Sequence, residues 1–212
     1  MNNKKTARNR EIFNLVFASA LIAIIIVLTV FAGYINFGFV QITIIHIPVI
    51  IGAIILGKRY GLILGLVFGL GAMIRSFVEV LPQNVIFTNP LLSVLPRMFF
   101  GYITAVLYQF LRTKIKKESL AVTFTMILAT TIHTVVVVPL LYVIAKTGFY
   151  FYAADMHEAV LELIGPRFFP FLLVVIINNS LWEIAAAAVI GTPITLAVNQ
   201  QMVHRYQTMD RK

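Results

Sequence analysis

The 212-residue sequence contains no cysteine, and only 12% of its residues are charged. Without cysteine, the chain can form neither a disulfide framework nor a thiolate metal site. A soluble domain carries about 25% charged residues, about twice the share found here. Hydrophobic residues make up 60% of the chain, and its mean hydropathy is +0.93. This composition predicts a multi-pass integral protein of the cell membrane.

Acidic residues are also scarce, with 8 Asp and Glu against 17 Lys and Arg. A net charge of +9 could indicate a nucleic-acid partner, but the basic residues flank apolar runs, where they report membrane topology instead. No group of His, Asp and Glu has the spacing of metal ligands. The G-x-x-x-x-G-K-[ST] pattern of a phosphate-binding loop is absent. We therefore expect no metal, no cofactor and no nucleic acid.

Six apolar segments predict an all-α membrane domain over residues 1–212 with six transmembrane helices. The expected spans cover about residues 12–32, 42–56, 60–78, 90–111, 120–145 and 168–196. Thirteen of the 17 Lys and Arg lie in four segments between or beyond these spans, at residues 1–11, 58–59, 112–117 and 200–212. The positive-inside rule places these four segments, and with them both termini, in the cytoplasm.

Arg97 is a permanent charge inside an apolar helix, within the stretch N-P-L-L-S-V-L-P-R-M-F-F-G at residues 89–101. An arginine at the bilayer centre costs about 2.5–3.5 kcal/mol or more, so such a residue usually faces protein, water or ligand. Pro96 predicts a kink or the true start of the helix, with free backbone groups beside Arg97. That arrangement favours an anion-binding corner. The alternative is an arginine that snorkels to the headgroups.

The predicted orientation places Arg97 near the outer end of its helix. Asn178, Asn179 and Trp182 lie two to four turns inward from the outer end of the last span. Together they predict an outward-facing pocket with fixed charge, amide groups and a stacking surface, suited to a small polar molecule with an anionic group. A competing cation, Arg75, is expected to pair with Glu79 four residues later. The candidate binding residues are Arg97, Asn178, Asn179, Trp182, His133, Tyr34, Phe37 and Asn89.

Small residues at four-residue spacing predict close helix contacts in two spans. Ser19, Ala20 and Ala23 form such a face in the first span, and Gly61 and Gly65 begin another in the third, continued by Gly69. Small-xxx-small patterns let a second helix approach closely. The face in the first span can pack within the protein itself or against a partner.

The chain resembles the substrate-binding S component of an energy-coupling factor (ECF) vitamin transporter. The features that carry the resemblance are six short spans in about 200 residues, the uncharged outer segment 33–41 and the N-P-x-x-S-x-L-P-R-x-x-x-G stretch. The sequences I-I-H-I-P-V-I-I-G-A at 44–53 and S-V-L-P-R at 93–97 resemble the pantothenate branch. The resemblance implies a high-affinity vitamin-binding subunit, not an enzyme.

The resemblance also implies partners. A membrane scaffold subunit and two ATPase subunits would supply the energy for transport. Ser19, Ala20 and Ala23 match the position of the family's Ala-x-x-x-Ala contact with the scaffold, although Ser19 replaces the first alanine. The outer segment that contains Tyr34 and Phe37 would act as a gate, or else as an interfacial aromatic belt.

Three other readings stay open at this point. Folate, riboflavin or a pyridine- or pyrimidine-type vitamin could be the substrate of the same transporter class. An intramembrane enzyme could use His133, His46 or Glu183, although no sequence pair places a base beside a nucleophile. A structural six-span membrane protein is the third, and it would bind no specific small molecule.

Overall fold

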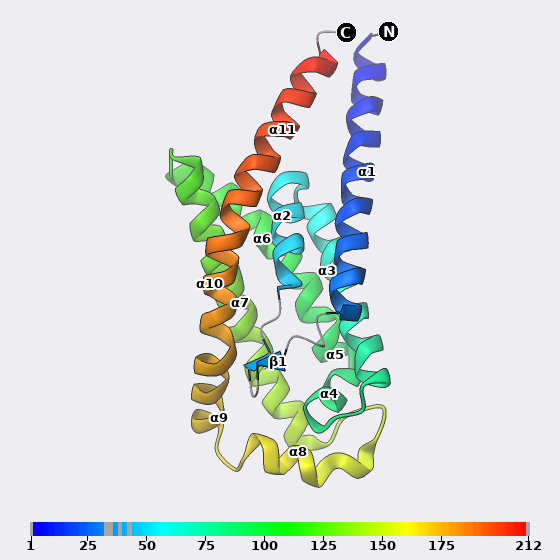
Figure 1. Ribbon diagram of the computed structural model, residues 1–212, viewed down its shortest axis with the longest axis vertical. Coiled ribbons are helices and arrows are strands. Elements are labelled where there is room, and N and C mark those ends of the chain that lie inside the picture. Colours follow the sequence, from blue (N-terminus) through cyan, green and yellow to red (C-terminus); the bar gives the residue numbers. More distant parts are fainter. Residues whose placement is uncertain (1, 32–35, 38–39, 42–43, 211–212) are drawn as a thin grey trace.

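The chain forms an elongated bundle of helices with both termini at the same end (Figure 1). The computed structural model describes residues 2–31, 36–37, 40–41 and 44–210. Within these ranges, five helices are long and apolar enough to cross a membrane, and a sixth apolar helix, His46–Leu56, is shorter. The protein is therefore an all-helical membrane protein with five candidate spans.

The helices at the two ends of the chain extend well beyond the predicted spans. The first begins at Asn2 and the last ends at Asp210, so both basic tails continue as helix. In chain order the elements are α1 (Asn2–Phe31), β1 (Asn36–Phe37), β2 (Val40–Gln41), α2 (His46–Leu56), α3 (Lys58–Val78), α4 (Pro82–Val85), η2 (Ile86–Thr88), α5 (Pro90–Ser93), α6 (Leu95–Lys114), α7 (Glu118–Thr147), η3 (Ala154–Met156), α8 (His157–Ile164), α9 (Phe168–Val175), η4 (Ile176–Ser180), α10 (Leu181–Ala186), η5 (Ala187–Gly191) and α11 (Thr192–Asp210).

The fourth predicted span is two helices rather than one. Helix α5 ends at Ser93 and α6 begins at Leu95, with Pro96 in the first turn of α6. Proline is favoured in a first turn because its missing N–H is not needed there. The same missing N–H leaves the carbonyl of Leu92 without its usual helical donor four residues later. Pro96 thus marks a helix start, one of the two alternatives that the sequence allowed.

Helices α3 and α6 pack backbone against backbone. A Cβ atom built on Gly101 would lie 1.9 Å from the carbonyl oxygen of Gly61, and one on Gly65 would lie 2.1 Å from the carbonyl oxygen of Arg97. No side chain fits in either place, so only glycine permits this approach. The close helix contact predicted from the spacing of Gly61 and Gly65 is confirmed.

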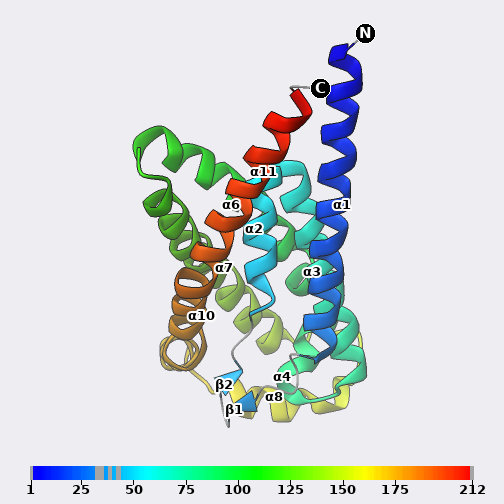
Figure 2. The ribbon, with the colours of Figure 1, turned by 45° about the horizontal axis from the view of Figure 1, so that its top comes forward.

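Short helices cover the end of the bundle opposite the termini, where α4 and α8 lie near each other and near the β1–β2 hairpin (Figure 2). Helix α8 buries Val160 and Ile164 and exposes Leu163. Helix α8 (His157–Ile164) is thus amphipathic. This layer covers the membrane bundle at that end.

The glycine contact predicts a large loss of stability from a single added side chain. Gly101→Val should lower the thermal midpoint of the detergent-purified protein strongly, because overpacking a close contact typically costs about 1–3 kcal/mol or more. The control is Ala185→Val, since Ala185 is exposed on α10. Midpoints are read from the monodisperse size-exclusion peak after heating. Equal midpoints for the two variants would show that α3 and α6 can separate at little cost.

Candidate functional site

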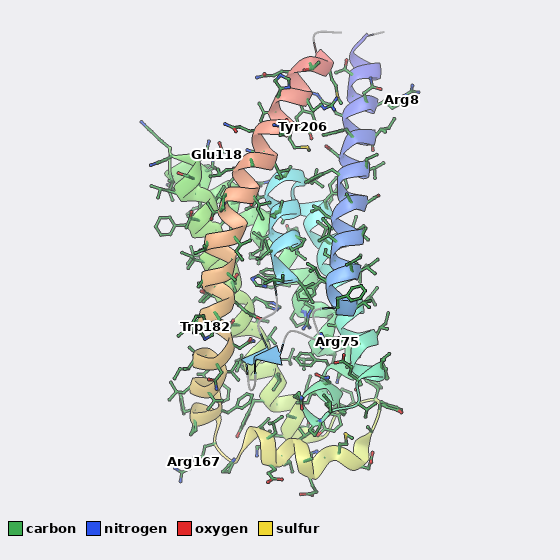
Figure 3. The ribbon with its side chains drawn as sticks, in the orientation of Figure 1. Arg8, Arg75, Glu118, Arg167, Trp182 and Tyr206 are labelled. Atoms are coloured by element: carbon green, nitrogen blue, oxygen red, sulfur yellow. The ribbon has the colours of Figure 1, made fainter. Side chains whose placement is uncertain are left out.

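A cavity of about 710 Å³ lies between the helices, in the half of the bundle away from the termini. Its walls come from the first turn of α2, the second half of α3, the start of α6 and the second half of α7. The first half of the C-terminal helix, which consists of α9, η4, α10, η5 and α11 in succession, forms the remaining wall. Arg75, on the wall from α3, is labelled in that half of the molecule (Figure 3). Several outer elements, including η2 and α8, complete the lining.

Arg97 is held in this cavity by its own backbone neighbours. The side chain is 8% exposed, and its Nη1 atom donates to the carbonyl oxygen of Ser93 at 2.8 Å and of Leu92 at 3.3 Å. The guanidinium lies over the ring of Phe68, 4.8 Å from its centroid, and 5.2 Å from the centroid of Phe87. Such cation–π contacts stabilise a desolvated charge. The side chain therefore does not snorkel to the headgroups.

The anion-binding corner expected beside Arg97 differs from the observed arrangement. Pro96 frees the carbonyl of Leu92, and Arg97 itself donates to that carbonyl. Carbonyl oxygens accept hydrogen bonds, so these backbone groups cannot bind an anion. The Nε atom of Arg97 is buried and has no hydrogen-bond partner within the described part of the chain. At this corner the guanidinium, through Nε, is therefore the group that can bind an anion.

Two histidines contribute further polar atoms to the cavity. The His133 ring lies 4.8 Å from the Phe100 ring between centroids, and its Nδ1 atom is buried without a partner among the described residues. His46, the first residue of α2, is 3% exposed, and its Nε2 atom is also buried without a hydrogen-bond partner among the described residues. His133, one of the predicted binding residues, lines the cavity. His46, which was not among the predicted binding residues, lines it too.

Asn178 and Asn179 line the cavity from the C-terminal helix. Both lie in η4, a π-helical segment, and the buried Oδ1 atom of Asn179 has no partner in the described structure. A π turn contains more residues than an α turn, so successive side chains point in more similar directions. Both amides can therefore face one cavity. Single π turns inside α-helices are frequent at functional sites.

Two predicted binding residues do not line the cavity. Trp182 is 56% exposed, on the side of α10 that faces away from the bundle (Figure 3). Asn89 is fully buried, but its Oδ1 atom accepts from the N–H of Leu91 at 2.9 Å and its Nδ2 atom donates to the carbonyl of Phe149 at 2.8 Å. Asn89 thus caps α5 and fixes a loop. Tyr34 and the Phe37 side chain lie outside the described residues.

Charged side chains of both signs line the cavity. Arg75 and Glu79 form the expected ion pair, with 2.9 Å between Nη2 and Oε2. Glu183, 9% exposed, lines the cavity and interacts electrostatically with Arg97. In sequence Glu183 had been considered only as a catalytic residue. Its position one turn after Asn179 is the signal that could have placed it in the pocket.

The family profile described as "ECF transporter, substrate-specific component" matches residues 13–195. The chain belongs to this family. A curated relative, the "Pantothenic acid transporter PanT" of Lactococcus lactis subsp. cremoris (strain MG1363), is 26% identical over 172 residues, covering 74% of this chain and 78% of the relative. The family resemblance noted in the sequence is thereby confirmed.

As an ECF S component, the chain is a substrate-binding, non-catalytic subunit of a membrane transporter. S components partner with the energy-coupling module of such transporters. The enzyme and structural-protein alternatives are therefore wrong. Within this S component, the 710 Å³ cavity around Arg97 is the site whose geometry suits a small molecule, because concave, largely apolar sites with a few converging polar groups are typical of ligand pockets.

Proposed function

We propose that this S component binds pantothenate in the cavity around Arg97 and delivers it for import. The observation that carries the proposal is a set of four buried polar atoms, without hydrogen-bond partners in the described structure, on residues that line one cavity. They are Arg97 Nε, His46 Nε2, His133 Nδ1 and Asn179 Oδ1. The curated relative that carries pantothenic acid in its name supports the same substrate.

Pantothenate offers one carboxylate, one amide and two hydroxyl groups, which suits this set. The guanidinium of Arg97 binds the carboxylate through charge-assisted hydrogen bonds. Asn178, Asn179, His46 and His133 supply donors and acceptors for the amide and the hydroxyls. The guanidinium of Arg75 is hydrogen-bonded to Glu79, whereas Nε of Arg97 has no hydrogen-bond partner in the described structure. Arg97 is therefore better placed to bind the carboxylate. Riboflavin, an alternative substrate, has no carboxylate for Arg97 to bind.

The proposal includes six spans in a single domain, with α2 as the short sixth span and both termini in the cytoplasm. The distribution of Lys and Arg supports this orientation. The cavity then opens toward the outside, and the β1–β2 hairpin, whose second strand contacts η4, acts as the gate. Tyr34 and Phe37 belong to the gate segment.

Energy for import comes from an energy-coupling module, which we propose consists of a membrane scaffold subunit and two ATPases. The small-residue face of α1, formed by Ser19, Ala20 and Ala23, is available to dock against the scaffold subunit. Ser19, Ala20 and Ala23 are exposed, whereas Ala18 and Leu21 are buried in the bundle. The Ser19 hydroxyl donates to the carbonyl of Leu15 at 2.9 Å, so it needs no partner from another subunit.

The carboxylate role of Arg97 predicts how the protein distinguishes pantothenate from pantothenol, in which a neutral CH₂OH replaces the carboxylate. A charge-assisted pair contributes about 1.5–3 kcal/mol. The wild-type chain should therefore prefer pantothenate by roughly 10- to 150-fold in calorimetry. Arg97→Met should lose most of this preference, and Arg97→Lys should recover only part of it, because lysine lacks the planar two-pronged contact.

A double variant, Arg75→Gln with Glu79→Gln, provides the control because it removes the paired arginine of the same cavity. It should keep the preference for pantothenate. Equal wild-type affinity for pantothenate and pantothenol would exclude the carboxylate role. Binding of folate, riboflavin or a pyridine-type vitamin, but not of pantothenate, would replace the substrate while leaving the family assignment intact.

The orientation predicts which single cysteines are accessible from outside intact cells. Because the sequence contains no cysteine, each introduced thiol is the only reactive one. Asp155→Cys, at an exposed position before α8, should react with an impermeant maleimide added to intact cells. Lys116→Cys, in the loop before α7, should react only after the cells are opened. The reverse pattern would invert the topology.

The small face of α1 predicts that docking and ligand binding can be separated. Ser19→Trp or Ala23→Trp should abolish both vitamin uptake and co-purification of the scaffold subunit, because the bulky ring prevents close helix approach. Pantothenate binding to the isolated chain should stay at the wild-type level. Loss of binding together with docking would mean that these residues support the fold of the protein itself.

A further inference from the structure

A second cavity, of about 540 Å³, lies between α1 and α3 at the end of the bundle that carries the termini. It shares no lining residue with the cavity around Arg97. The residues that line it are Ala7, Arg10, Glu11, Asn14, Leu15, Arg59, Tyr60 and Ile63. We call it the α1–α3 groove.

The polar wall of the α1–α3 groove is ordered by a contact with the C-terminal helix. The guanidinium of Arg10 lies over the Tyr206 ring, 5.4 Å from its centroid, and the Tyr206 hydroxyl donates to Oδ1 of Asn14. The Phe13 ring meets Tyr206 edge-on at 6.3 Å between centroids. Tyr206 is labelled in Figure 3 between α11 and α1. The positions of Arg10 and Asn14 are thus set before any ligand binds.

Polarity changes along the groove in the same direction on both helices. Helices α1 and α3 both run from the end with the termini toward the opposite end (Figure 1). Arg10 on α1 is followed five residues later by Leu15, which is 53% exposed, and Arg59 on α3 is followed four residues later by Ile63, which is 43% exposed. At 1.5 Å per residue the aliphatic side chains lie about 6–8 Å deeper than the arginines.

That order, cations first and exposed aliphatic side chains one turn deeper, matches a phospholipid at a membrane interface. We propose that the α1–α3 groove binds one anionic glycerophospholipid, with its phosphodiester on Arg10 and Arg59 and its acyl chains along Leu15 and Ile63. The groove is lined by two arginines and one carboxylate, that of Glu11, so its net charge is +1, which complements one phosphodiester. Glu11 and Asn14 offer acceptors to headgroup hydroxyls, as in phosphatidylglycerol.

A free phosphate ion fits the groove less well, because it would occupy only the arginine end and make no use of the aliphatic end. A zwitterionic lipid carries no net charge to complement the excess of arginine. The bound lipid would bridge α1 and α3 on one side, as Tyr206 bridges α1 and α11 on the other. This site depends on the chain lying in a bilayer and not on the identity of the transported vitamin.

Native mass spectrometry of the detergent-purified chain tests the proposal with three lipids of identical acyl chains. Phosphatidylglycerol should be retained in preference to phosphatidylcholine and phosphatidylethanolamine, as one lipid per chain. An arginine or lysine near an anionic lipid surface raises the affinity for that surface roughly fivefold. The double variant Arg10→Gln with Arg59→Gln should therefore lower the preference by an order of magnitude or more.

The matched control is Lys116→Gln with Lys117→Gln, which removes the same charge from exposed positions in the loop between α6 and α7. It should leave the preference unchanged. If the double arginine variant does not fold, Arg59→Gln alone, at an exposed position, should still lower the preference for phosphatidylglycerol roughly fivefold. Equal retention of the three lipids, an equal loss in the lysine control, or displacement of the lipid by millimolar inorganic phosphate would each overturn the proposal.

Discussion

The contact between the Cα atom of Gly65 and the backbone of Arg97 is the constraint on which the cavity depends. A Cβ at residue 65 would lie 2.1 Å from the Arg97 carbonyl oxygen, so α3 and α6 can approach this closely only with glycine there. Phe68 follows Gly65 by three residues, on the same side of α3, and its ring lies 4.8 Å from the Arg97 guanidinium. The glycine therefore sets the separation of the ring from the charge, although Gly65 itself does not line the cavity.

The buried charge of Arg97 is stabilised by groups of its own chain segment and of two other helices, α3 and α10. A charge removed from water needs hydrogen-bond partners or an opposite charge. Pro96 frees the Leu92 carbonyl, and Arg97 donates to it and to the Ser93 carbonyl. The rings of Phe68 and Phe87 cover the guanidinium, and Glu183 adds an electrostatic interaction. These contacts hold one nitrogen of the guanidinium and leave Nε for a ligand.

The sequence alone predicted the membrane class, the long apolar helices and several of the residues that carry charge and amides into the cavity, because each depends on local pattern. It could not separate Asn89 from Asn179, since an asparagine that caps a helix and one that faces a cavity look alike until the backbone is placed. Trp182 was assigned by its depth along the last span, which does not tell which side of a helix faces the cavity. In the structure Glu183 lines the cavity, whereas Trp182 is exposed. His46 was missed because its neighbours at the cavity, Arg97 and His133, are distant in sequence.

The two π segments of the C-terminal helix also make it sensitive to chain length. Each π turn contains one residue more than the α turn it replaces, so deleting one residue between Ile176 and Ser180 would restore regular α-helical phase. The helix would shorten by only about 1.5 Å, which a membrane accommodates easily. The helical parts on either side would keep nearly the same orientation, because the residue removed is the extra one of the π turn, whereas the side chains inside the segment would turn to new directions. A single-codon deletion would thus rearrange the amide groups in the wall of the cavity while Glu183 keeps its place.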